Sequence, residues 1–195
     1  MMRITPAVKH LLILNVIIFA GTSLGNKYFF DGILALYYPM SSAFKFWQIV
    51  THMFMHGSFT HLVFNMFALW MFGTAVEQQF GLRKFLIFYL SCGFGAVALT
   101  FLIYFIQIYP LISNLEANGF SFDLIQELTA LNILEGNMFK GELLVNKMQA
   151  LLEYNGMSLS QVDNISFKAL FDLNVKSNGS MVGASGAIMG ILVAF

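Results

Sequence analysis

Four long stretches of this chain contain no Asp, Glu, Lys or Arg, and this pattern constrains the fold more than any other feature. In chain order they are residues 11–26, 48–76, 85–115 and 177–195. A helix needs about 20 apolar residues, each adding ~1.5 Å, to cross the hydrocarbon core of a bilayer. The stretches therefore predict an all-α membrane protein whose helices pack as a transmembrane bundle.

The overall composition agrees with a membrane protein and excludes several other classes. Only 10% of the residues are charged and 58% are hydrophobic, whereas a typical soluble domain has about 25% charged residues. Ten basic and ten acidic residues balance, so no net field attracts polyanions and no nucleic-acid partner is expected. Cys92 is the single cysteine, which excludes a disulfide scaffold. The lipid bilayer is the expected partner.

The positions of the basic residues predict an orientation. Cytoplasmic loops of membrane proteins carry an excess of Lys and Arg, and two such groups flank the first three stretches: Arg3, Lys9, Arg83 and Lys84. We therefore expect a cytoplasmic N-terminus, with the first and third helices running outward and the second and fourth inward. The bias is reduced by two lysines in the first outer loop, Lys27 and Lys45.

The first stretch also fits a secretory signal peptide, because two basic residues precede a short apolar run. Three more hydrophobic stretches follow, and Ala20-Gly21-Thr22 is a poor cleavage site. A first membrane helix is the favoured interpretation.

The segment between the third and fourth stretches has a different composition. Residues 116–176 contain eight acidic and four basic side chains, and their apolar residues recur at intervals of three and four, which is typical of amphipathic helices. We divide the chain into a membrane core with helices one to three (1–110), an acidic, helical extramembrane insert (111–176) and the start of a fourth core helix (177–195).

Several polar side chains lie near the start of the second stretch: His52, His56, His61 and Asn65. Polar groups in membrane helices are costly and often functional. His61 and Asn65 are four residues apart, so a helix places them on one face. Three interpretations remain open: hydrogen bonds between helices, an anion-stabilising pair for catalysis, and a metal site, which is least favoured because no Cys or carboxylate lies nearby.

A serine lies between glycines where the fourth stretch becomes helical. Gly183 and Gly186 remove side chains around Ser185, so another backbone can approach its hydroxyl. A helix N-terminus also offers unpaired N–H groups to a developing oxyanion. The alternative is helix packing, since Gly186 and Gly190 form a common Gly-x-x-x-Gly pattern. By itself, this motif favours packing.

Taken together, the motifs resemble the rhomboid family of intramembrane serine proteases. They are Trp47-Gln48, the segment THMFMHGSFTHLVFNMFALWMFG (51–73), Glu77-x-x-x-Gly81 and Gly183-Ala184-Ser185-Gly186. The His-x-x-x-Asn and Gly-x-Ser-Gly motifs are more specific as a pair than alone. The resemblance implies four of the six core helices of that fold.

The resemblance implies a Ser–His dyad that cuts transmembrane segments of membrane-protein substrates. Ser185 would be the nucleophile, and its N–H with the side chains of His61 and Asn65 would hold the oxyanion. Supporting roles would fall to His52, His56, Trp47, Gly183 and Gly186. No metal or cofactor is implied. We expect a multi-pass protein of the bacterial inner (plasma) membrane with its active site towards the outer side.

Two departures from the family pattern affect these expectations. Gln48 stands where the family usually has Arg, so an interaction that anchors the first loop is expected to be weaker or rearranged. The family's general base is a His in the last core helix, but no His follows His61. We therefore expect a truncated sequence that lacks two helices and is inactive alone. The alternative is a non-catalytic rhomboid-like protein that binds transmembrane clients; a channel or transporter is less favoured.

Overall fold

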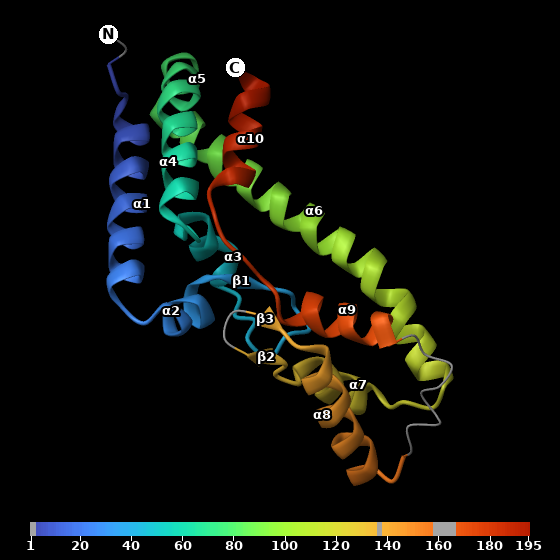
Figure 1. Ribbon diagram of the computed structural model, residues 1–195. Coiled ribbons are helices and arrows are strands. Elements are labelled where there is room, and N and C mark those ends of the chain that lie inside the picture. Colours follow the sequence, from blue (N-terminus) through green and yellow to red (C-terminus); the bar gives the residue numbers. More distant parts are fainter. Residues whose placement is uncertain (1–2, 136–137, 158–166) are drawn as a thin grey trace. The chain divides into compact units, whose positions relative to one another are not determined.

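The computed structural model describes residues 3–135, 138–157 and 167–195, and most of its regular elements are helices (Figure 1). The chain forms two compact units. Unit 1 comprises Met1–Leu36, Lys45–Phe101 and Ser180–Phe195, and unit 2 comprises Tyr37–Phe44 and Leu102–Gly179.

Unit 1 contains most of the apolar helices. Its elements are α1 (Pro6–Leu24), α2 (Lys27–Leu34), α3 (Gln48–Thr51), a 3₁₀ turn (His52–Phe54), α4 (Phe59–Ala68), a π-helical segment (Leu69–Gly73), α5 (Thr74–Phe80), the first part of α6 (Leu82–Ala117), β4 (Ser180–Met181) and α10 (Ser185–Ala194). β1 (Leu36–Tyr37) lies at the boundary of the two units.

Three helices of the described chain are long and apolar enough to cross a membrane, which confirms the predicted all-α membrane fold. They are Pro6–Leu24, the continuous Phe59–Phe80 formed by α4, the π-helical segment and α5, and Leu82–Ala117. The 36 residues of α6 extend about 54 Å at 1.5 Å each, which exceeds the ~30 Å hydrocarbon core.

The second and fourth predicted stretches differ from the observed helices at their starts. The second helix begins at Phe59, because Ser58 caps it by accepting the backbone N–H of His61 at 3.2 Å. Residues 48–58 form a short helix and a turn instead. The fourth helix begins at Ser185, because the positive φ of Gly183, 122°, interrupts regular backbone just before it.

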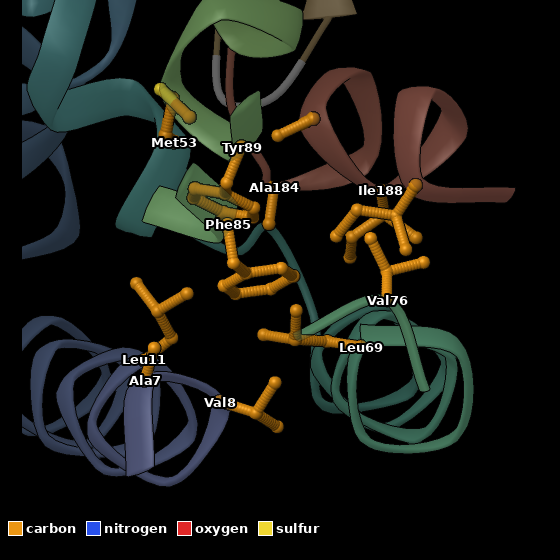
Figure 2. Close-up of a cluster of buried hydrophobic side chains, with 12 residues drawn as sticks. Ala7, Val8, Leu11, Met53, Leu69, Val76, Phe85, Tyr89, Ala184 and Ile188 are labelled. Carbon is orange, nitrogen blue, oxygen red and sulfur yellow. The ribbon is translucent and has the colours of Figure 1, made fainter. Parts of the chain in front are cut away.

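The helices of unit 1 pack around one buried apolar cluster. Figure 2 shows side chains from α1, the 3₁₀ turn, the α4–α5 helix, α6 and α10 converging, among them Ala7, Val8, Leu11, Met53, Leu69, Val76, Phe85, Tyr89, Ala184 and Ile188. In Figure 1, α10 runs in the same direction as α4–α5, and α1 runs opposite to both. The first residues of α4 and α10 therefore lie at the same end of the unit.

At the other end of unit 1, Glu77 holds the start of α1. Its Oε1 accepts the N–H of Ala7 and its Oε2 that of Val8, both at 2.9 Å. Glu77 is only 3% exposed. The first N–H groups of a helix have no partner within it, so the carboxylate satisfies two of them and joins α1 to α5.

Small residues bring α6 and α10 into close contact. A Cβ built on Gly186 would lie 2.5 Å from the Cβ of Ala96, and one on Gly190 would lie 2.6 Å from the Cβ of Cys92. Neither position has room for a side chain. Gly186 and Gly190 therefore allow close packing of α10 against α6, as a Gly-x-x-x-Gly pattern predicts.

Unit 2 contains the second half of α6 and the elements α7 (Phe122–Ala130), β2 (Leu134–Glu135), β3 (Met138–Phe139), α8 (Gly141–Tyr154) and α9 (Phe167–Asn178). The amphipathic helices predicted here are present, since α8 buries Leu144, Met148 and Leu152 at intervals of four. Buried Asn174 donates to the carbonyls of Leu128 and Leu131 at 3.0 Å each, which closes the end of α7.

An antiparallel pair, β2 with β3, was not predicted for this segment. Residues 136–137 and 158–166 of the predicted insert lie outside the described residues. Its boundaries at 111 and 176 and its extramembrane position stay predictions.

The Glu77 carboxylate predicts a specific loss of stability. Glu77→Gln leaves one amide oxygen to accept where two carboxylate oxygens did, so the free energy of unfolding should fall by about 2 kcal/mol, as for hydrogen bonds to a charged group. Reversible unfolding in mixed micelles measures this. The exposed neighbour is the control: Gln78→Ala should change stability by less than about 0.5 kcal/mol, and equal effects of the two variants would contradict the role of Glu77.

The contact between Gly190 and Cys92 predicts a rescue. Gly190→Ala should destabilise the protein by about 1–3 kcal/mol through overpacking, and adding Cys92→Gly should recover part of this loss. Gly95→Ala is the matched control, because a Cβ there meets nothing within 4 Å. The same unfolding assay applies. Strictly additive effects in the double variant would show that the two residues are not in contact.

Candidate active site

Ser185 is the first residue of α10, and a sharp turn at Gly183 presents it. The N–H of Gly183 donates to the carbonyl of His52 at 2.8 Å, which fixes the turn against the 3₁₀ segment. Ser185 itself is exposed. A helix N-terminus has unpaired N–H groups and a partial positive charge, so the serine lies where a developing anion would be stabilised.

His61 and Asn65 lie directly against this turn. A Cβ on Gly183 would lie 2.9 Å from Nε2 of His61 and 3.6 Å from Nδ2 of Asn65. Both side chains come from the first two turns of α4. Glycine is therefore required at 183 both for its positive φ and for this close approach.

The amide nitrogen of Asn65 is buried and has no hydrogen-bond partner among the described residues. Buried amides are almost always hydrogen-bonded, and an unpaired one costs about 1–3 kcal/mol. This nitrogen lies close to Gly183, which precedes Ser185 by two residues. It is therefore available to a group that enters beside Ser185.

The other two histidines of the motif occupy different positions. Nδ1 of His52 lies 2.8 Å from the carbonyl oxygen of Gln48, so Nδ1 donates there and Nε2 is the unprotonated nitrogen. The ring of His56 lies 5.1 Å from that of His61. Burial, with a smaller contribution from His61, lowers the pKa of His56 to about 4, so His56 is neutral at pH 7.

A cavity of about 240 Å³ adjoins Ser185. Its walls come from the 3₁₀ turn, α6 and the start of α10, and include His52, Met53, Gly93, Ala96, Thr100, Met181, Ser185 and Met189. They are mainly small and apolar, so an apolar side chain fits them. Of the predicted residues, His52, Gly183, Ser185 and Gly186 line this cavity, whereas His61 and Asn65 border the Gly183 turn beside it.

The sequence analysis did not single out Thr100, Met53 or Met181. Thr100 donates to the carbonyl of Ala96 at 2.9 Å and lies 3.9 Å from the sulfur of Met181. Thr100 is a polar residue in a charge-free stretch, which could have marked it. It is far in sequence from both the histidine motif and the serine motif, so its place beside Ser185 could not be inferred.

Trp47 and its neighbours anchor the first loop. Trp47 Nε1 donates to Ile33 O at 2.8 Å, Gln48 Nε2 to Gly32 O at 3.2 Å and Thr51 Oγ1 to Leu34 O at 2.8 Å. These are carbonyls of the last turn of α2, which have no partner within a helix. Gln48 also accepts the N–H of Lys45. The side-chain amide of Gln48 thus anchors the first loop, by donating to Gly32 and accepting from Lys45.

The described residues contain no group of three His, Cys, Asp or Glu that could hold a metal ion. What the arrangement offers is an exposed hydroxyl at a helix N-terminus, an unpaired amide donor and an imidazole beside it, and an apolar cavity. Such donors are suited to stabilise an oxyanion formed by attack of the hydroxyl on a carbonyl.

The comparisons with known proteins agree on one family. The family model described as the Rhomboid domain matches residues 43–109, which include His52, His56, His61 and Asn65 but not Ser185. The chain is 42% identical over 55 residues to "Rhomboid protease GluP" of Bacillus subtilis, covering 28% of this chain and 11% of that protein.

Two eukaryotic proteins give similar matches. "RHOMBOID-like protein 6, mitochondrial" of Arabidopsis thaliana is 43% identical over 54 residues, covering 28% of this chain and 18% of that protein. "Rhomboid-like protease 3" of Toxoplasma gondii is 36% identical over 55 residues, covering 28% and 21%. In each case the chain spans less than a quarter of the relative's length. Residues 43–109 of this membrane-helical chain are therefore similar to the Rhomboid domain, and the relatives that match it carry rhomboid names.

Proposed function

We propose that this chain carries the nucleophile and the oxyanion-binding groups of an intramembrane serine protease. The observation that carries the proposal is the buried, unpaired Asn65 amide, which lies with His61 against the backbone two residues before Ser185. An unpaired buried donor is a cost to folding, and a transition state that it binds gives a reason for its presence. The rhomboid proteases among the relatives support the reaction class.

In the proposed reaction, Ser185 Oγ attacks the scissile carbonyl carbon while its proton passes to a base. The carbonyl oxygen becomes an oxyanion, which accepts hydrogen bonds from the N–H of Ser185 and the side chains of His61 and Asn65. Collapse breaks the C–N bond, and the base returns the proton to the leaving amine. Water then cleaves the acyl-enzyme ester in the same manner.

The base in this proposal is a histidine, as the family resemblance implies. No histidine follows His61 in these 195 residues, so we expect these residues alone to be inactive. Experiments on activity therefore use the complete gene product. The alternative is a rhomboid-like protein that binds transmembrane clients without cutting them, and the presence of Ser185 together with His61 and Asn65 favours the protease.

The substrates we propose are transmembrane segments of other membrane proteins. A chain in a lipid bilayer meets such segments laterally, and the apolar walls of the cavity beside Ser185 fit an apolar side chain of one. The basic residues Arg3, Lys9, Arg83 and Lys84 favour a cytoplasmic N-terminus. With that orientation the site opens towards the outer side of a bacterial inner membrane.

Replacement of the nucleophile tests the proposal. The gene product, reconstituted in liposomes with a single-pass reporter substrate, should lose all detectable cleavage on Ser185→Ala, because no other group forms the acyl-enzyme. Ser91→Ala is the matched control, since Ser91 is also a serine of an apolar helix but lies outside the cavity; it should cleave like the wild type. Cleavage that survives Ser185→Ala rejects the assignment, and capture of the reporter without any cleavage by the wild type supports the binding alternative.

Asn65 gives a second test, which separates a catalytic donor from a structural one. Asn65→Leu keeps the number and branching of the side-chain heavy atoms and removes a donor that has no partner among the described residues, so the free energy of unfolding should stay within about 1 kcal/mol of the wild type or rise. The kcat for reporter cleavage should fall about 10²–10³-fold, as for loss of one oxyanion donor. A protein that unfolds readily but retains its kcat would assign Asn65 to folding alone.

A further inference from the structure

A groove of about 470 Å³ lies on unit 1 where α5 meets α6, away from the residues around Ser185. Its walls are Gln79 and Phe80 of α5 and four residues of α6, Lys84, Ile87, Phe88 and Ser91. These four recur at i, i+3, i+4 and i+7, so they form one helix face. The groove runs from a basic residue in the first turn of α6 about two turns, or ~10 Å, into an apolar span.

The charge at the mouth of the groove is positive. Arg83 adjoins Lys84, and Arg3 and Lys9 precede or begin α1, whose start Glu77 holds at the same end of the unit. Unit 1 contains only two acidic residues in its sequence, Asp31 and Glu77. Glu77 is buried with both oxygens bonded to α1, and Asp31 is in α2, which follows the far end of α1. Neither acid neutralises Lys84.

Beyond Lys84 along α6, the walls of the groove are mainly apolar side chains that are partly exposed. Ile87 is 67% exposed, and Phe80 and Phe88 contact each other edge to face with ring centroids 5.5 Å apart. This pair forms a rigid side wall. Ser91, which is exposed and has a small side chain, lines the end of the groove farthest from Lys84 along α6.

We propose that this groove binds one anionic phospholipid, with the phosphate at Lys84 and an acyl chain along Phe80, Ile87, Phe88 and Ser91. Along α6 the groove begins with a cation and continues with apolar walls into the membrane span. A phospholipid has the matching sequence of groups, an anionic headgroup followed by an apolar acyl chain. Basic pockets at the ends of membrane helices bind acidic headgroups for this reason. The inference is independent of proteolysis.

Native mass spectrometry of the purified protein in an uncharged detergent tests the site. Phosphatidylglycerol and phosphatidylcholine with the same chains are titrated separately, and the wild type should bind one phosphatidylglycerol more tightly than phosphatidylcholine. Lys84→Gln should weaken phosphatidylglycerol binding about fivefold, the effect of one cation near an anionic surface. Its matched control is Lys27→Gln, the same change at the start of α2, which should alter binding less than twofold.

A second pair of variants tests the chain-binding wall. Ser91→Phe should fill the lower groove and weaken binding of the phospholipid, whereas Leu99→Phe, on the exposed surface of the same helix, should not. Equal losses for Lys84→Gln and Lys27→Gln, or no effect of Ser91→Phe, would overturn the proposal. So would competition by millimolar inorganic phosphate, which would indicate a site for free anions, or a dimer that Ser91→Phe abolishes, which would assign the groove to a second copy.

Discussion

The packing of unit 1 depends on glycines that leave one face of α10 without side chains. Gly186 and Gly190 allow the backbone of α10 to contact Ala96 and Cys92 of α6. Gly183 allows the preceding turn to contact His61 and Asn65 of α4. A bilayer provides no hydrophobic force between helices, so close packing of small residues has to hold them together. The same close packing brings the turn that precedes Ser185 against the polar residues of α4.

Two sets of polar interactions lie at the ends of this packed core. Glu77 secures the start of α1 at one end, and at the other end Trp47, Gln48 and Thr51 secure the last turn of α2. Each set satisfies backbone groups that a helix leaves unpaired at its ends. The buried amide nitrogen of Asn65 in α4 differs from these groups, because no described residue pairs with it.

The sequence predicted the helices of unit 1 better than the details of the site. Missing charges located the spans because a membrane helix tolerates few of them, and the histidine and serine motifs identified which polar residues gather. Thr100, Met53 and Met181 were not predicted, because only packing of α6 against α10 brings them beside Ser185. The start of the fourth helix at the glycine-flanked serine agrees with the prediction, whereas the positive φ of Gly183 was not predicted, because composition does not reveal it. The hairpin of β2 and β3 has strands too short for an alternating pattern.

The central claim is that Ser185 is an activated nucleophile, and covalent labelling tests it most directly. Membranes that contain the complete gene product are treated with a fluorophosphonate probe, and the adduct is mapped by peptide mass spectrometry. We expect one adduct, on Ser185, and Asn65→Leu should slow its formation, because the phosphoryl oxygen of the probe accepts from the same donors as the oxyanion. An unlabelled Ser185, while another serine hydrolase in the same membranes reacts, would contradict it.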